Sequence, residues 1–531
     1  MSKANAINRY PVERILAILS PNSVVGMEVT NAKIRYYAPD GKPKDDFLQS
    51  EISNWRNSPD YAYIKKANAY YENQNDINSR IRYTFNGKGS KVRSKLSNKK
   101  RSHAFFRDLV DQRVRYLLTK PFTLRTEDSE EGNAYNDALE EYFTNEFRRR
   151  FKNLGKSSTI DGLAWLQVAY STDGNLTFTR VPREQVIPFW ADEDHTILDA
   201  VIRFYDITVF KGEEDEVITK VQFHTKEGSW YYQQDSKGFH EDTDREFSHE
   251  PHFWMNRPRQ ELKGEDVETD GQDVLLGEDG NEVRTGMLWD RVPFIAFKAS
   301  ADELSLLKLV KSLIDEYDME SSDLGNLIAD QPESIKIVKN YQGTSPEEFL
   351  QKLADYRTMF VGEGGDVNTI TDAINIVGIY TDLDNIRKNI YHFGNGVDYS
   401  VSVLGNSTGV GLKFLYGKLA AAADDMADEF QAAFENLLWF INQDILLKTG
   451  VDYTGQKAQL VFNTDMIINE TETIDNVVKS INLLSDKTAL ENHPWVQDVT
   501  QEIEARKEKE DAEIDALISR YGMPNPGNND I

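Results

Sequence analysis

Cysteine is absent from this chain of 531 residues. Its absence excludes disulfide bonds, thiol catalysis and zinc sites built on cysteine. Long apolar runs are absent too, because no stretch approaches the roughly 18 continuous apolar residues of a membrane-spanning helix. The N-terminus has only a short apolar patch and no small-residue cleavage site, so we expect no secretory signal. These absences predict a protein that is soluble and cytoplasmic when made.

Positive charge is also in short supply. The chain has 61 Lys and Arg against 88 Asp and Glu, a formal net charge of −27. Because affinity for phosphate backbones comes from Lys and Arg, we expect no tight wrapping of nucleic acid. A surface of like charge can still surround DNA without gripping it, and it can equally serve solubility alone. Length, 39% hydrophobic residues and 11% aromatics predict several domains with substantial cores.

No catalytic motif stands in the sequence. Gly155–Ser158 reads GKSS, but a phosphate-binding loop needs glycine five residues earlier, where this chain has Arg150. Gly362–Gly365 (GEGG) lacks the strand–loop–helix context of a dinucleotide site. The eight histidines form no pair with metal spacing, and no nucleophile elbow is present. We therefore predict no enzyme activity, no cofactor and no metal site.

Apolar periodicity divides the first 300 residues. Spacings of three and four from Phe106 to Leu117 predict an amphipathic helix, and further helices are expected over 134–151 and 155–170. From Leu176 the period becomes two, which predicts short antiparallel strands. Residues 256–286 are expected to form a long acidic loop.

The second half contains helices that are long for a globular domain. One is expected from Asp302 to Asp330, about 40 Å, and another from Leu412 to Leu447, about 50 Å. Between them lie an insertion with two strands and a helix, and then an amphipathic helix from Thr381 that must stop near Gly394. Two helices joined by a small polar loop, with no catalytic set nearby, indicate moving machinery.

A basic run stands out in this acidic chain. It consists of Lys88, Lys91, Arg93, Lys95, Lys99, Lys100 and Arg101. Either it is a solvated loop, or it contacts DNA or an acidic neighbouring subunit.

Four patterns in a fixed order resemble one known family. They are HAFFRDLVDQRVRYLLTKP, VPREQVIPFW with LDAVIRFY, IRKNIYHFGNGVDYSVSVLGNSTGVGLKFLYGKL, and TALENHPWVQDVTQEIE. From about residue 90 to 520 this order resembles the portal (head–tail connector) proteins of tailed bacteriophages, of the type found in siphophages of Gram-positive bacteria. The resemblance implies an α+β, multidomain phage portal fold with wing, stem, clip and crown, long helices, and assembly as a ring.

The resemblance also implies a domain order. It consists of an N-terminal α+β wing (1–301), stem helix 1 (302–330), a clip (331–379), stem helix 2 (380–397), a tunnel loop (398–411), a long wing helix with a return strand (412–466), crown helices (467–521) and a flexible tail (522–531). The acidic 256–286 loop has no counterpart in that order.

Site residues follow from the same resemblance. The tunnel loop that faces DNA would be Tyr399, Ser400, Val401, Ser402, Val403, Leu404, Gly405, Asn406, Ser407 and Thr408. The hinge glycines would be Gly394, Gly396, Gly409 and Gly411. Lys413 and Lys418 are candidates for transient contact with the DNA backbone, or both lie on the outer face of their helix. Clip residues that bind partners would be Lys336, Lys339, Tyr341, Glu347, Glu348 and Arg357.

The implied function is a portal in the virion, at one capsid vertex, assembled in the host cytoplasm. Its subunits form a ring of twelve through which terminase packages double-stranded DNA and through which the genome is later ejected. The implied partners are other copies of the chain, terminase, head-completion or adaptor proteins, scaffold and the major capsid protein, with no membrane. Two alternatives remain: a capsid or adaptor protein without a channel, and a metal-dependent nuclease that uses the many carboxylates.

Overall fold

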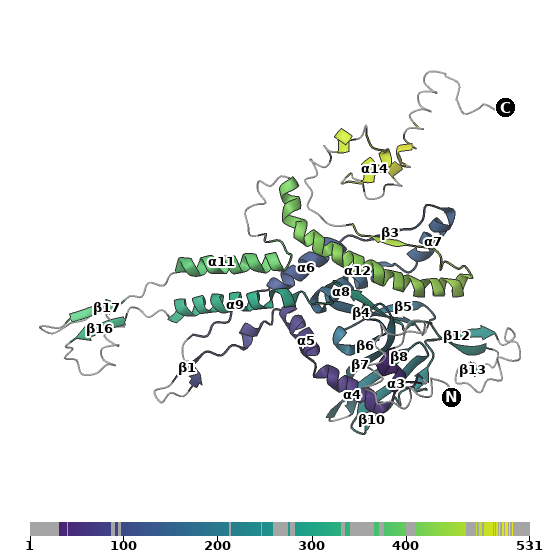
Figure 1. Ribbon diagram of the computed structural model, residues 1–531, viewed down its shortest axis with the longest axis horizontal. Helices are drawn as coiled ribbons and strands as arrows, with labels where there is room; N and C mark the ends of the chain where they lie inside the picture. The colour runs from purple at the N-terminus through teal and green to yellow at the C-terminus, as the bar shows by residue number, and fades with distance from the viewer. Residues whose placement is uncertain are drawn as a thin grey trace, which may run out of the picture. The chain divides into compact units, whose positions relative to one another are not determined.

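The structure is a computed structural model. It describes residues 31–39, 41–85, 91–93, 97–171, 173–211, 214–245, 247–258, 274–276, 282–330, 335–339, 366–370, 376–399 and 409–463, and parts of 474–512. The chain divides into two compact units (Figure 1). The first comprises residues 1–396 and 421–464, and the second comprises residues 397–420 and 465–531. Helices and strands are mixed throughout the first unit, which confirms the α+β prediction.

A six-stranded antiparallel sheet forms one part of the first unit. Its strands are β10 (Gly238–Glu241), β9 (Gly228–Asp235), β8 (Glu214–Thr225), β7 (Leu198–Lys211) and β6 (Val186–Trp190), with β11 (His249–Glu250) paired to β9. The alternating pattern after Leu176 is therefore confirmed as antiparallel strands. Gly238, with φ 108°, begins β10 at the turn that follows β9. Phe47, Leu48, Ile202 and Phe223 share one core cluster, so α3 (Ala32–Tyr37) and α4 (Asp45–Arg56) cover one face.

A three-stranded sheet lies beside it, in the order β15 (Phe294–Lys298), β4 (Leu163–Tyr170), β5 (Leu176–Val181). The helix predicted over 155–170 was wrong in its second half. The helix α8 (Asn145–Asp161) ends where Gly162 adopts φ 96°, and β4 begins at once. The run LAWLQVAY is mostly buried because β4 is the central strand, with neighbours on both sides. Such a doubly buried strand has no alternation by which sequence reasoning can recognise it.

The acidic 256–286 segment is not one continuous loop, as had been expected. Its two ends lie in the strands β12 (Phe253–Pro258) and β14 (Glu282–Met287), which pair along their full length. A third strand, β13 (Val274–Leu276), pairs with the other side of β14. The pairing partners are distant in sequence, so the local composition gave no sign of a sheet.

Helices α5 (Pro59–Tyr71), α6 (Phe105–Leu118) and α7 (Glu130–Glu140) complete this part, with a 3-10 turn η2 (Asp76–Ser79). The helix expected around Phe106–Leu117 is confirmed as α6, whereas the helix expected over 134–151 is divided between α7 and α8. Two small antiparallel pairs join β1 (Tyr83–Phe85) to β2 (Lys91–Arg93) and β3 (Thr123–Arg125) to β18 (Gln459–Val461).

An aromatic core holds α8, the three-stranded sheet and the long helix α12 (Gly409–Thr449) together. The ring of Phe151 contacts those of Phe297 and Phe430, with centroids 5.7 and 5.3 Å apart. Phe143 joins the same core against Phe434 of α12. Edge-to-face aromatic packing of this kind adds to the burial of large apolar surfaces. Phe430 contacts Phe151 of α8 and Phe297 of β15, so this part of α12 packs against both elements.

Two further helices, α9 (Leu307–Asp330) and α11 (Ile376–Phe393), lie side by side (Figure 1). Between them in the sequence stands an antiparallel pair, β16 (Ile335–Lys339) with β17 (Asp366–Ile370). The strands expected in this insertion are confirmed, and its expected helix falls outside the described residues. In the second unit the described elements are the start of α12 and α14 (Asp486–Glu491).

Candidate channel and partner-binding elements

The paired helices α9 and α11 lie where two long helices were expected, with shifted starts. Helix α9 begins at Leu307, because Asp302–Leu306 is not helical and the Ser305 hydroxyl accepts a hydrogen bond from the Leu307 N–H at 3.2 Å. Helix α11 begins at Ile376, five residues before Thr381, so residues 376–379 are helical. Its expected end near Gly394 is confirmed.

Both helices of this pair carry buried and exposed apolar residues. Val310 and Ile314 of α9 and Ile390 of α11 are fully buried. Leu309 and Ile328 of α9 are each about half exposed, at 50% and 52%. On α11, Val377 is 76% exposed and Tyr380 is 58% exposed. Single exposed apolar residues are ordinary on a protein surface. These four, on two helices that lie side by side, are candidates for contact with another protein.

Acidic groups meet between the same two helices. Burial, followed by the negative charges of Asp382 and Glu316, raises the pKa of Glu320. Glu320 and Glu316 lie on α9 and Asp382 lies on α11. Like charges this close favour retention of a proton by one of them.

The end of the basic run is tied to α9. The Arg101 N–H donates to the Ser322 hydroxyl at 2.9 Å, and its guanidinium donates to the Ser321 carbonyl at 3.2 Å. A Cβ on Gly325 would stand 3.0 Å from the Arg101 Cζ, so the guanidinium packs on this glycine. Lys99 donates its N–H to Asn326 of α9 at 2.7 Å. Lys99, Lys100 and Arg101 remain exposed, so this end of the run is a solvent-facing segment attached to α9. Lys91 and Arg93 lie in β2, and Lys88 and Lys95 fall outside the described residues.

Residues 97–103, which we call the strap, are held on α9 by a buried carboxylate. Asp318 of α9 is fully buried and accepts from the His103 N–H at 3.0 Å and from the Asn75 amide at 2.6 Å. The His103 Nδ1 lies 2.7 Å from the same carboxylate. Sequence reasoning missed the strap, because carboxylates are so abundant here that no single one stands out.

Two of the expected hinge glycines, Gly394 and Gly396, lie at the end of α11 and pack closely against α6. Neither Gly394 nor Gly396 has a positive φ, whereas Asn395 between them has φ 53°. A Cβ on Gly394 or Gly396 would stand 2.5 or 2.3 Å from a methyl group of Leu109. Close packing against α6 therefore leaves no room for a Cβ at either position. Asn at a left-handed position was a signal that could have been read from the sequence.

Most of the expected tunnel loop falls outside the described residues. Tyr399 is described and exposed, and Ser400–Thr408 are not described. Gly409 and Gly411 lie within α12, so the helix begins three residues before Leu412 and the two glycines are not loop residues. The residues after these two glycines are mostly good helix formers, and they favour a helix that extends back to include both glycines. Lys413 lies in the same helix, and Lys418 is exposed.

The expected clip residues are described only in part. Lys336 and Lys339 lie in β16, opposite Thr369 and Asp366 of β17. Tyr341, Glu347, Glu348 and Arg357 fall outside the described residues.

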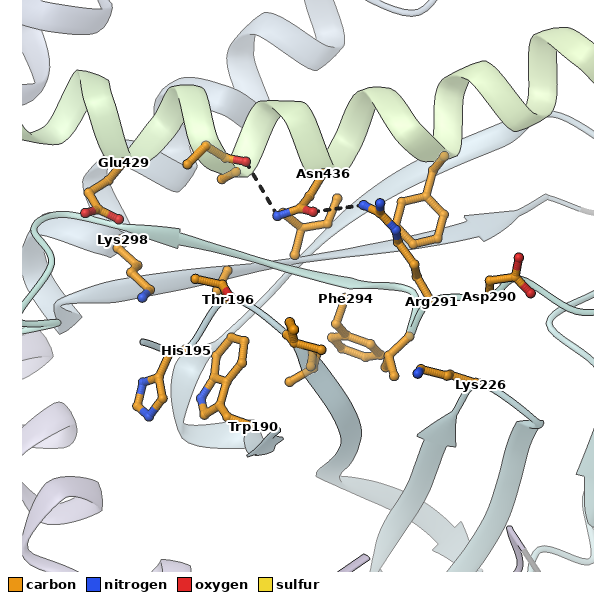
Figure 2. A pocket seen from close by; sticks show the side chains of 18 residues that line it. Trp190, His195, Thr196, Lys226, Asp290, Arg291, Phe294, Lys298, Glu429 and Asn436 are labelled. Atoms are coloured by element: carbon orange, nitrogen blue, oxygen red, sulfur yellow. Dashed lines mark hydrogen bonds between the residues drawn. The ribbon is translucent and has the colours of Figure 1, made fainter. Parts of the chain in front are cut away.

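Sequence reasoning also missed a cleft in the first unit, with a volume of about 390 Å³ (Figure 2). It is lined by β15, by one face of α12, by Trp190 at the end of β6 and by the loop that follows β6, which carries His195. The His195 Nδ1 lies 2.7 Å from Glu303, and the Lys298 ammonium lies 3.1 Å from the same carboxylate. At the other end of the cleft, Arg291 donates to Asn436 at 3.0 Å.

Within the described ranges, no group of three or more His, Asp or Glu side chains is arranged to hold a metal ion. None of the described helices combines the length and the apolar character that crossing a membrane requires.

Comparison with known proteins agrees with the order of parts. Two relatives are each named a portal protein. The one from Clostridium phage phiCD119 is 27% identical over 454 residues, which is 82% of this chain and 90% of that protein. The one from Bacillus phage SPP1 is 26% identical over 476 residues, which is 88% of this chain and 87% of that protein.

Two solved structures are similar over much of the chain. The neck of an empty GTA particle, with C6 symmetry, has 10% identity and a TM-score of 0.43, and covers 73% of this chain and 90% of that one. The neck of the native GTA particle, with C12 symmetry, has 12% identity and a TM-score of 0.39, and covers 72% and 89%. A family model described as "Phage portal protein, SPP1 Gp6-like" matches residues 55–516. The chain therefore belongs to the phage portal protein family.

Proposed function

We propose that this chain is the subunit of a ring-shaped channel at one vertex of a phage capsid, with about twelve copies around the axis. Double-stranded DNA enters through the ring during packaging by terminase and leaves through it on ejection. The observation that carries the proposal is the family match across residues 55–516. The chain contributes no catalysis of its own, and ATP hydrolysis belongs to the terminase.

We assign the domain roles expected for the family to elements of this chain, with the bounds given above. We assign α9 and α11 to the stem, β16 and β17 to the clip, residues 398–408 to the tunnel loop, α12 with β18 to the wing and residues 467–521 to the crown. The exposed apolar side chains on both stem helices support this assignment, because neighbouring copies in a ring would bury them.

The clip is the proposed docking surface for terminase and, later, for head-completion or adaptor proteins, through Lys336, Lys339, Tyr341, Glu347, Glu348 and Arg357. Scaffold and the major capsid protein are proposed partners during assembly of the head in the host cytoplasm. The net charge of −27 supports passage of DNA without adhesion, since like charge weakens contact with phosphates.

The test is the native mass of the purified protein, together with electron-microscope class averages of the same sample. We expect particles of about twelve times the subunit mass of 60.8 kDa, with a central hole. A stable monomer at every salt concentration would favour an adaptor protein without a channel. DNA cleavage with magnesium or manganese would favour a nuclease.

Within this proposal, Lys413 and Lys418 touch the passing DNA backbone transiently. Replacement of both by alanine should reduce the amount of DNA packaged per head, because two positive charges near the phosphates are lost. An unchanged amount would mean that both lysines lie away from the channel.

A further inference from the structure

Helix α9 has charges of opposite sign on opposite sides. The strap lies on one side, where its backbone N–H groups donate to Asp318 and to the Ser322 hydroxyl. Glu316 and Glu320 are each two residues away from Asp318 along the helix. A step of two residues turns roughly 200° around a helix axis, so both carboxylates lie on the side away from the strap. We call these two surfaces the strap side and the carboxylate side of α9.

The strap side presents three cations. Lys99, Lys100 and Arg101 are exposed. The Lys100 ammonium donates to the Asn78 carbonyl at 2.7 Å, and the Arg101 guanidinium donates to the Ser321 carbonyl at 3.2 Å. Both acceptors are neutral, and in the part of the chain that the structure describes no carboxylate pairs with these three cations. The strap side therefore has positive charge to offer to a partner.

Two apolar side chains lie beside these cations. Ile81 and Tyr83 are each nearly half exposed. Arg82, which stands between them in the sequence, donates from its guanidinium to the Ser97 carbonyl of the strap at 2.8 Å. The strap side thus combines positive charge with exposed apolar surface, which is the composition of a protein-binding surface.

The carboxylate side has the complementary composition. Glu316 is exposed, and burial, followed by the negative charges of Asp382 and Glu316, raises the pKa of Glu320. Of the described residues that shift this pKa, none is a cation. Leu309 and Leu327 are exposed, and they stand seven residues before and eleven residues after Glu316. These spacings are close to two and three helical turns, so both leucines lie on the carboxylate side.

We propose that the strap side of one subunit docks on the carboxylate side of α9 in the next subunit. The three cations of the strap then lie against Glu316, Glu320 and Asp382, and the apolar side chains of the two sides cover one another. Each copy uses a different side toward each of its two neighbours, so the contact repeats head to tail and closes into a ring. The inference rests on the ring proposed above and names the surfaces that join its subunits.

A second copy of the chain fits the strap side better than DNA does. A DNA backbone would supply phosphates to the cations, but it would leave Ile81 and Tyr83 exposed. It would also leave the repulsion among the carboxylates of α9 and α11 unrelieved, whereas the cations of a neighbouring subunit relieve it.

Mixing of charge-reversed subunits tests the contact. One variant carries Lys99→Glu with Lys100→Glu, and the other carries Glu316→Lys with Glu320→Lys. In either variant alone, like charges meet at every contact, so we expect at least about tenfold fewer rings than from the unaltered chain. In an equimolar mixture, an even-numbered ring can alternate the two variants, opposite charges meet at every contact, and rings should return. Sedimentation velocity measures the rings, and circular dichroism checks the fold.

Lys237→Glu with Lys457→Glu is the matched control, because it changes the net charge equally at exposed positions after β9 and after α12. Rings from either reversed variant alone, or no rings from their mixture, would overturn the inference. Normal rings with weaker DNA binding in the strap variant would assign the strap to DNA and would overturn it too. If the unaltered chain forms no rings, the proposed function fails as well, whereas rings that survive both charge reversals remove this inference alone.

Crosslinking gives a second test that needs no charge reversal, and the chain has no cysteine of its own. Lys100→Cys is combined in turn with Glu316→Cys and with Glu320→Cys, and a short bismaleimide is added to the assembled protein. The two positions of each pair lie on opposite sides of α9, so we expect covalent chains of two or more subunits from at least one pair. Products confined to single chains, or no product from either pair, would contradict the proposed contact.

Discussion

Two buried aspartates show how differently single residues are accommodated in this protein. Asp318 accepts hydrogen bonds from His103 and Asn75. Asp161 is also buried, but its carboxylate accepts only from the Asn68 amide at 2.8 Å, while the Arg183 guanidinium donates to its backbone carbonyl. Burial, followed by the charge of Glu184, raises the pKa of Asp161 to about 7. The first aspartate stabilises the strap on α9, whereas ionisation of the second is costly.

Asp161→Asn should therefore remove a pH-dependent loss of stability. The pKa of Asp161 is about 7 in the folded state, above the usual value of about 3.9 in an unfolded chain, so the folded state binds a proton between these values. Stability falls as the pH rises through this window, and the full cost applies above pH 7. Because each pKa unit corresponds to about 1.4 kcal/mol, we expect the gain of the variant over the unaltered chain to be about 2–3 kcal/mol larger at pH 8 than at pH 5. Thermal unfolding at both pH values measures this gain, and an equal difference at both would contradict it.

Asp318→Ala should weaken the attachment of the strap to α9. The substitution leaves the His103 N–H and the Asn75 amide without their acceptor, at a cost of about 2–4 kcal/mol. The expected result is a lower unfolding midpoint and faster amide exchange in residues 97–103. Asp384→Ala, at a partly exposed position of α11, is the control and should change neither quantity. Unchanged exchange in Asp318→Ala would show that the strap is held by its other contacts.

At the scale of elements, the sequence predicted where α11 ends, but it did not show the packing that explains this end. Glycine indicated the end of α11, and the structure confirms that end at Phe393. The physical reason is the approach of Gly394 and Gly396 to Leu109 of α6, which lies far away in sequence. The start of α9 was misplaced because Ser305, and not Asp302, bonds to the first helical N–H.

Gly396→Ala should destabilise the junction between α11 and α6. The new Cβ would stand 2.3 Å from the Leu109 side chain, and such overpacking costs about 1–3 kcal/mol. Gly417→Ala is the matched control, because its Cβ has no neighbour within 4 Å and alanine favours a helix by about 0.5–1 kcal/mol. Denaturant unfolding measures both variants. If steric contact is the cause, the additional change Leu109→Ala should restore part of the loss, and no restoration would point to backbone freedom instead.

At the scale of the whole molecule, the proposed ring would account for exposed apolar side chains on α9 and α11. Val377, Tyr380 and Ile328 are exposed on these two adjacent helices. Association of copies around an axis would bury them, and the cost of their exposure becomes a driving force for assembly.

Val377→Asp combined with Ile328→Asp should therefore impair assembly and leave the fold of the subunit intact. Two charges at an apolar contact are expected to weaken association at least about tenfold, because they must be desolvated when copies meet. Sedimentation velocity measures the fraction of rings, and circular dichroism checks the fold. Asn385→Asp with Asn389→Asp, at exposed polar positions of α11, is the control. Normal rings from the apolar-site variant would place the interface elsewhere.

The sequence by itself determined what depends on local pattern and composition. The absence of cysteine, the antiparallel strands after Leu176, the end of α11 and the long helix α12 were all predicted from neighbouring residues. The order of these parts was enough to indicate the portal family, which the family match confirms.

Only the tertiary structure decided the features that join distant segments. The central strand β4, the strap on α9, the packing of Gly396 on Leu109 and the cleft beside β15 each depend on partners that lie far apart in the chain. Apolar periodicity shows which face of an element is buried, but it does not show which other element covers that face. Burial on both faces removes the periodic signal altogether, which is why β4 was taken for a helix.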